Sequence, residues 1–152
     1  MECWIKPAFT VIGKEGSTED GPDFVARLWA EANGCFPEIA GLVKQAESGA
    51  PVGVWGAMTD LSRRFLPWED GFSRGLYLAG AECRDDAQPP EGWVRWDVPG
   101  FEYMRIRNDG PEAFRHGLEL LAAQGLPLAG AVQEYNDPSA GAAYLCYPVR
   151  RL

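Results

Sequence analysis

The sequence has little of what most metal, redox and hydrolytic sites require. It contains one histidine, and its four cysteines (Cys3, Cys35, Cys83 and Cys146) are far apart, with no Cys-x-x-Cys pair. Zinc sites need several such ligands at short spacing, so we expect no metal. The sequence also lacks a phosphate-binding loop, a dinucleotide fingerprint and a recognisable Ser-His-Asp set, and we therefore expect no cofactor.

Basic residues and long apolar runs are also scarce. Lysine and arginine total 14 against 22 aspartates and glutamates, which gives a formal net charge of −8. A protein that binds nucleic acid needs a positive surface, so the charge argues against a direct nucleic-acid partner and weakly favours cationic ligands. No apolar run is long enough for a signal peptide or a membrane span. We expect reduced thiols, a cytoplasmic protein and no membrane partner.

A repeated pattern organises the chain. The run Asp-Gly-Pro followed by an acidic residue occurs at residues 20–23 and again at 109–112. Each run starts a segment of helical periodicity, with one strand-like segment before it and two after it. The length favours one domain, residues 1–152, built from pseudo-repeats at about 1–88 and 89–152.

The repeat predicts an α+β fold of two pseudo-symmetric strand-helix-strand-strand modules, with an antiparallel sheet and the helices on one face. The first helix is expected to bury Phe24 and Trp29, and the second to bury Phe114. Pro7 and Pro99-Gly100 each interrupt a long strand-like segment and predict a bend there. The expected strands are residues 3–16, 52–58, 75–82, 93–107, 129–136 and 142–149.

The first repeat carries two insertions that the second lacks. One is a short helical piece around Pro37, and the other is the loop 61–74, which contains Phe65, Trp68 and Phe72. Loops of this length are uncommon in compact domains and often serve binding. Two interpretations stay open: the loop is a lid or pocket wall, or it folds its aromatic rings onto the core as a plug.

A second difference between the repeats is a charge. Aligning Gly53 with Gly130 places Glu134 opposite Ala57, inside a predicted strand. Strand alternation puts Glu134 on one face of the sheet and Tyr135 on the other. The two repeats therefore differ by a carboxylate on one face of a late strand.

A carboxylate among β-branched and aromatic neighbours must be exposed at an edge, paired, or lining a cavity. We expect Glu134 to face a ligand, and an ion pair with Arg105 or Arg107 on a neighbouring strand is the alternative. The chain also has six tryptophans, and a surplus of large aromatic residues fits a binding pocket that needs flat walls.

Three other polar residues are interpreted without a functional role. His116 lies on the polar side of its predicted helix, so we expect a solvated side chain. Asp60 and Asp137 begin turns, where aspartate side chains accept backbone hydrogen bonds.

Several short motifs, taken in order, resemble the GyrI-like small-molecule-binding family. The central pair is Pro-Glu-Gly-Trp at 90–93 followed by Val-Pro-Gly-Phe-Glu-Tyr at 98–103, which is similar to the family's "P-E-G … P-x-x-x-Y" signature. The resemblance covers essentially the whole chain. The accompanying motifs are Leu28-Trp29, Trp55-Gly56, Tyr77-Leu78-Ala79-Gly80 and Glu134-Tyr135-Asn136-Asp137-Pro138.

The resemblance implies two strand-helix-strand-strand modules whose junction holds amphipathic, aromatic and often cationic compounds. It also implies a late-strand glutamate among aromatic rings, and Glu134 is the candidate. Many members have one residue between this glutamate and a tyrosine, whereas Glu134 and Tyr135 are adjacent here. The family also forms effector-binding domains of drug-sensing regulators. Without preceding DNA-binding helices, this chain is expected to be a stand-alone member.

Two functions follow from these observations, and a protein-interaction role such as binding gyrase is a third alternative that the resemblance leaves open. The first is binding or sequestration of aromatic, cationic small molecules in a cleft between the modules. The second is a hydrolase that opens the cyclopropane ring of DNA-alkylating natural products, as the resemblance implies for part of the family. In that reaction Glu134 would position or deprotonate a water molecule, and the Tyr103 hydroxyl would stabilise the developing oxyanion. The expected ligand-binding residues are Glu134, Trp55, Trp68, Phe72, Tyr103 and Tyr135.

Overall fold

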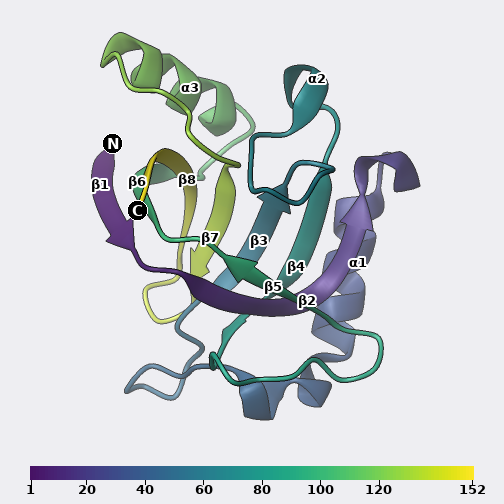
Figure 1. Cartoon of the computed structure of the whole chain (residues 1–152). Helices are drawn as coiled ribbons and strands as arrows, with labels where there is room; N and C mark the ends of the chain where they lie inside the picture. The colour runs from purple at the N-terminus through teal and green to yellow at the C-terminus, as the bar shows by residue number, and fades with distance from the viewer.

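An eight-stranded antiparallel sheet curls around its own core and carries the helices on one face (Figure 1). The computed structural model describes all 152 residues. The strand order is β1-β6-β8-β7-β3-β4-β2-β5. The strands are β1 (Glu2–Lys6), β2 (Phe9–Ser17), β3 (Val54–Thr59), β4 (Leu76–Cys83), β5 (Val94–Val98), β6 (Phe101–Arg107), β7 (Gln133–Asp137) and β8 (Ala142–Arg151). The helices are α1 (Phe24–Gly34), α2 (Glu69–Phe72) and α3 (Ala113–Ala123), with single turns η1 (Thr18–Asp20), η2 (Phe36–Glu38) and η3 (Ala40–Leu42).

Each half of the sheet contains one strand-helix-strand-strand module. The first is β2-α1-β3-β4 and the second is β6-α3-β7-β8. Helix α1 packs on β2 and β4, and α3 packs on β6 and β8. Strands β3 and β7 join the modules, with Gly56 opposite Glu134. The predicted α+β class, the paired modules and the helices on one face are confirmed.

The two outermost strands exchange between the halves. Strand β1 pairs with β6 of the second module, and β5 pairs with β2 of the first. The segments β1–β2 and β5–β6 are interrupted at Pro7-Ala8 and at Pro99-Gly100, where the sequence predicts bends. Because each segment crosses from one half of the sheet to the other, the sheet closes partly on itself (Figure 1).

Both faces of the sheet are buried. The face away from the helices carries an aromatic core that includes Phe9, Trp55 and Tyr103. We call it the inner face, and we call the opposite face, which carries Met58 and Glu134, the helix face. Two separate apolar clusters cover the helix face, one under α1 and one under α3. The boundary between these two clusters is where a cavity can form.

Two segments differ from the sequence-based expectation. The strand expected from Ala129 begins four residues later, because residues 129–132 run beside the aromatic loop instead, where the Ala131 N–H donates to the Phe65 carbonyl at 2.9 Å. The helical piece around Pro37 forms the two single turns η2 and η3. None of the helices is long and apolar enough to span a membrane.

Candidate functional site

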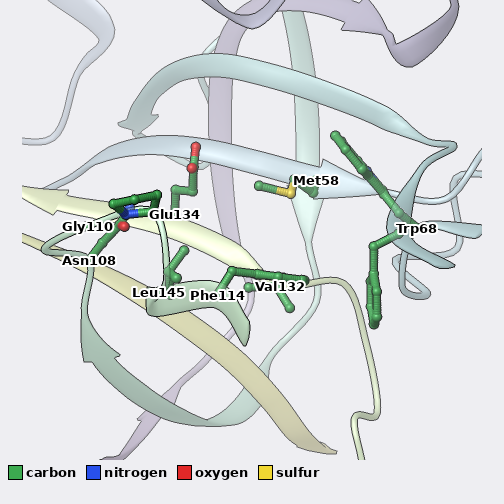
Figure 2. A pocket seen from close by; sticks show the side chains of 10 residues that line it. Met58, Trp68, Asn108, Gly110, Phe114, Val132, Glu134 and Leu145 are labelled. Atoms are coloured by element: carbon green, nitrogen blue, oxygen red, sulfur yellow. The ribbon is translucent and has the colours of Figure 1, made fainter. Parts of the chain in front are cut away.

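A cavity of about 330 Å³ opens on the helix face between the two apolar clusters (Figure 2). Its polar groups are the side chains of Glu134 and Asn108, and Gly110 and Pro111 form part of its rim. The volume lies at the lower end of the range typical of small-molecule pockets. The apolar walls come from β3, β8, α3, the loop 61–74 and the residue before β7, and they consist of Met58, Trp68, Phe72, Phe114, Val132 and Leu145.

Glu134 reaches this cavity from the middle of the sheet. On β7, Glu134 lies opposite Gly56 of β3 on one side and opposite Leu145 of β8 on the other. The carboxylate accepts a hydrogen bond from the Tyr77 hydroxyl, which comes from β4 on the far side of β3. A Cβ atom on Gly56 would collide with the Tyr77 hydroxyl and the Glu134 carboxylate. Glycine at position 56 is therefore required for this hydrogen bond to cross β3.

Helix α1 extends the hydrogen-bonded chain by one residue. The Trp29 Nε1–H donates to the Tyr77 hydroxyl oxygen at 2.8 Å. The Trp29 ring also lies edge-on to the Tyr77 ring, with 6.5 Å between the centroids. The Tyr77 hydroxyl thus makes two hydrogen bonds: it accepts from Trp29 and donates to Glu134. The single proton that the phenol can donate is committed to the carboxylate.

Glu134 has no basic partner. None of the ion pairs in the structure involves it. The Tyr77 hydroxyl is the only side-chain group that forms a hydrogen bond with it. Burial raises the pKa of the Glu134 carboxyl, and the hydrogen bond from Tyr77 opposes that rise only in part. Burial and the adjacent carboxylate also raise the pKa of the Tyr77 phenol. When Glu134 is ionised, the cavity holds a negative charge that no basic side chain of the protein neutralises.

The alternative of an arginine partner is wrong. Arg105 pairs with Glu2, 2.5 Å from guanidinium Nε to carboxylate Oε1. The Arg107 guanidinium lies over the Tyr144 ring, 5.1 Å from its centroid. Neither side chain turns toward Glu134, because both arginines share the face of β6 that carries Phe101 and Tyr103, which is the inner face.

The aromatic loop 61–74 serves both of the roles that the sequence left open. Phe65 packs edge-on against Trp96 of the inner face, with 5.9 Å between centroids, and acts as a plug. Trp68 and Phe72 line the cavity instead. The Trp68 Nε1–H donates to the Leu76 carbonyl at 3.0 Å, which fixes the indole as a wall. The Phe72 ring packs edge-on against Phe114 at 5.2 Å, which ties the loop to α3.

Asp60 anchors the start of this loop. Its buried carboxylate accepts hydrogen bonds from the backbone N–H groups of Arg64 at 2.9 Å and Leu66 at 3.3 Å. Burial raises the pKa of Asp60, but hydrogen bonds from Ser62 and the backbone outweigh it and hold the pKa below its usual range. Asp137 accepts from the backbone N–H groups of its own turn. The predicted turn roles of both aspartates are confirmed, and His116 is exposed as expected.

Three of the expected site residues lie away from the cavity. Trp55 and Tyr103 are 0% exposed and Tyr135 is 9% exposed, all within the core of the inner face. The reason is strand alternation, because neighbouring residues of a strand point to opposite faces. Tyr135 follows Glu134 on β7, and its partner on β3 is Trp55, so both rings lie on the inner face. The structure brings together Glu134, Trp68 and Phe72 but not these three.

The alignment of the repeats also needs correction by one residue. Ala57 belongs to the core of the inner face, whereas Glu134 lies on the helix face. Ala57 and Glu134 therefore cannot be equivalent positions of the two repeats. The counterpart of Glu134 on β3 is a residue of the helix face, either Gly56 or Met58. Met58 pairs with Tyr77 on β4, just as Glu134 pairs with Leu145 on β8.

Sequence reasoning missed Tyr77, Met58 and Leu145 as members of the site. Strand alternation puts Met58 on the face opposite to Trp55. The sequence does not tell which of these two faces also carries Glu134. Tyr77 had a weaker signal, because its role depends on a hydrogen bond that crosses a whole strand. The glycine at position 56 is the residue that makes this crossing possible.

No protein-family model and no curated protein matches the sequence. Several solved structures share the fold. The crystal structure of the EcmrR C-terminal domain has 13% identity and a TM-score of 0.64, and the match covers 99% of this chain and 98% of that one. SAV2435 bound to tetraphenylphosphonium has 12% identity and a TM-score of 0.62, covering 98% and 93%. EcmrR in its DNA complex has 11% identity and a TM-score of 0.65, and this chain spans only 57% of it.

Proposed function

We propose that this protein is a GyrI-like domain that binds lipophilic, aromatic cations in the cavity around Glu134. The observation that carries the proposal is a partly buried carboxylate without a basic partner, surrounded by aromatic and aliphatic walls. The solved complex of SAV2435 with tetraphenylphosphonium supports it, because that protein shares the fold and its ligand is a lipophilic cation.

The chemistry of the walls favours delocalised cations over compact ones. A cation over an aromatic face gains about 0.5–2 kcal/mol, and more when it is desolvated. A compact ammonium group would have to lose its strongly bound water to enter an apolar cavity, whereas a large delocalised cation loses little. In this proposal Glu134 supplies the charge, and Trp68 and Phe72 supply aromatic faces. Stacking contacts of this kind tolerate many ligand shapes.

Two ions of the same shape and opposite charge test the proposal. Tetraphenylphosphonium and tetraphenylborate each carry four phenyl rings, so they differ at the cavity chiefly in charge. Titration calorimetry on the wild type should show saturable binding of the cation and much weaker binding of the anion. Glu134→Gln should weaken cation binding by about tenfold or more and remove most of the discrimination between the two ions.

Glu47→Gln is the matched control, because Glu47 is exposed and takes part in no ion pair. This variant has the same net charge as Glu134→Gln but should retain wild-type affinity and discrimination. Equal binding of both ions by the wild type, or equal loss of affinity in both variants, would show that the net charge of the protein and not Glu134 is responsible.

We do not extend the proposal to ring-opening hydrolysis. That reaction was expected to use Tyr103 as an oxyanion donor, and the Tyr103 hydroxyl is buried in the inner face without a hydrogen-bond partner. No comparison points to such an activity. Mass analysis of a cyclopropane-bearing alkylator after incubation with the protein provides the check, and unchanged compound is the expected result.

A further inference from the structure

A second cavity, of about 220 Å³, lies between the C-terminal half of α1 and strands β3 and β4. It is bounded by Trp29 and Ala32 of α1, by Phe36 and Ile39 of the inserted turns, and by Trp93. The insertion around Pro37, which distinguishes the first repeat from the second, therefore forms one wall. This cavity shares no lining residue with the cavity around Glu134.

The lining of the second cavity is apolar and uncharged. Asn33 is the only residue in it with a polar amide side chain, and no acidic or basic side chain lines it. Small residues, Ala32 on the helix and Ala81 on β4, leave the space open between the larger rings. A dry apolar cavity of about 150 Å³ is large enough to bind benzene. A cavity of 220 Å³ has room for a ligand of about two fused rings.

Both indoles in the wall are held in place through their polar edges. The Trp93 Nε1–H donates to Glu38 at 2.8 Å, and the Lys14 ammonium lies 4.3 Å from the centroid of the Trp93 ring. Lys14 in turn donates to the Gly92 carbonyl at 2.7 Å. The Trp29 Nε1–H is committed to Tyr77. Because these N–H groups are satisfied within the protein, the indoles can offer a ligand only their apolar ring surfaces.

We propose that this second cavity is a binding site for small, flat, uncharged aromatic molecules of about two fused rings. Fixed aromatic walls lower the ordering cost of binding such a ligand. An ion is not favoured, because the lining contains no countercharge. Trp29 borders this site and is hydrogen-bonded through Tyr77 to Glu134, so one chain of three side chains links the two cavities.

Indole is a suitable probe, and the tryptophan side chains themselves report where it binds. Each of the six indole N–H groups gives one cross-peak in a ¹H–¹⁵N correlation spectrum of the labelled protein. Trp29→Phe, Trp68→Phe and Trp93→Phe each remove one peak and so assign the three that matter. Titration with indole should shift the Trp29 and Trp93 peaks saturably and leave the Trp68 peak in place.

Two variants fill the cavity from opposite sides. Ala32→Leu adds bulk from α1, and Val54→Phe adds it from β3. Either one should weaken indole binding by about tenfold or more, because the added side chain occupies the space of the ligand. Ala122→Leu makes the same change as Ala32→Leu at an exposed position of α3 and should bind indole as the wild type does. A well-dispersed spectrum identifies the variants that fold, and one folded filling variant is sufficient.

The outcomes separate this inference from the proposed function. A saturable shift confined to Trp29 and Trp93, lost on filling, supports the second site whether or not tetraphenylphosphonium binds. A shift of Trp68 that tetraphenylphosphonium reverses would place indole in the cavity of Glu134 and overturn the inference. It is also overturned if indole gives no saturable shift up to its solubility limit, or if a folded filling variant binds it unchanged.

Discussion

Two carboxylates, the buried Glu82 and the partly buried Glu134, lie on opposite faces of the same sheet and differ in their partners. Glu82 is 5% exposed and pairs with Lys6 at 3.0 Å and with the more exposed Lys44 at 3.7 Å. The Lys6 ammonium lies 4.4 Å from the centroid of the Phe9 ring and 5.8 Å from that of Trp55. Glu134 also lies near aromatic rings but has only the Tyr77 hydroxyl. The inner face thus contains a complete set of carboxylate, aromatic rings and cation within the chain, whereas the chain supplies only the first two at the cavity around Glu134.

The difference separates a structural ion pair from a binding site of the same chemistry. On the inner face, the cation is Lys6, which ends β1 directly before the bend at Pro7-Ala8. The ion pair that it forms is therefore part of the core. On the helix face, the cost of burying the carboxylate is not offset by any basic side chain of the chain. The following experiments test this contrast.

The largest effect is expected from Glu82→Gln. Removing one member of a buried ion pair leaves the other charge uncompensated, so the free energy of unfolding should fall by about 3 kcal/mol at neutral pH. Urea unfolding followed by tryptophan fluorescence measures it. Glu134→Gln is the comparison variant and should leave the free energy of unfolding equal or raised, because it removes a partly buried charge that has no basic partner. If the two variants were equally destabilised, the contrast between the two carboxylates would be broken.

The second effect is a pH dependence of cation binding. The folded-state pKa of Glu134 lies above its usual value of 4.5, since burial penalises the charged form. Cation affinity should therefore fall as the pH decreases through this raised pKa, by up to about tenfold per pH unit. The stability of the folded protein changes with pH in the opposite direction. The contribution of Glu134 to the free energy of unfolding is fully present below the pKa of the unfolded state and is lost as the pH rises through the pKa of the folded state.

Calorimetric titration of tetraphenylphosphonium across pH 4 to pH 8 measures the affinity change, on the order of a factor of ten per unit at most. Glu134→Gln should give a flat profile over the same range. A wild-type midpoint at or below the pKa of an ordinary glutamate would contradict the burial that the structure shows.

The smallest effect is expected from Tyr77→Phe. The variant removes the donor to Glu134 and the acceptor of Trp29, which should cost about 1 kcal/mol of the free energy of unfolding. Because the Tyr77 hydrogen bond lowers the pKa of Glu134, its loss should move the midpoint of the binding profile to higher pH. Tyr144→Phe is the control on the inner-face side, stacked on Tyr135, and should leave that midpoint unchanged.

The sequence predicts the architecture well for a physical reason. The Asp-Gly-Pro runs and the helical periodicity are local signals, and the bends at Pro7 and Pro99-Gly100 follow from the fixed geometry of proline. Alternation also predicts correctly that Glu134 and Tyr135 point to opposite faces. These features depend on neighbours in the chain and not on the closure of the sheet.

The site is harder to predict because both faces of this sheet are buried. Trp55, Tyr103 and Phe72 are equally aromatic in the sequence, but only Phe72 reaches the cavity. Which face holds a cavity depends on how the sheet curls, and that depends on pairings such as Trp4 with Tyr103, far apart in the chain. The Tyr77 contact likewise depends on the glycine at position 56, whose role appears only when β4, β3 and β7 lie side by side.

The exchanged outer strands have a consequence for the synthesis of the protein. Strand β1 is made first, but its partner β6 begins at Phe101, so β1 cannot pair until about a hundred residues later. At a translation rate of 5–20 residues per second, this delay is roughly 5–20 s. During that interval Trp4 lacks Tyr103, whose ring centroid lies 6.0 Å from its own in the folded protein. Closure of the sheet is thus a late event, and a chain that stalls before Phe101 presents an unpaired, aromatic strand to the chaperones of the cell.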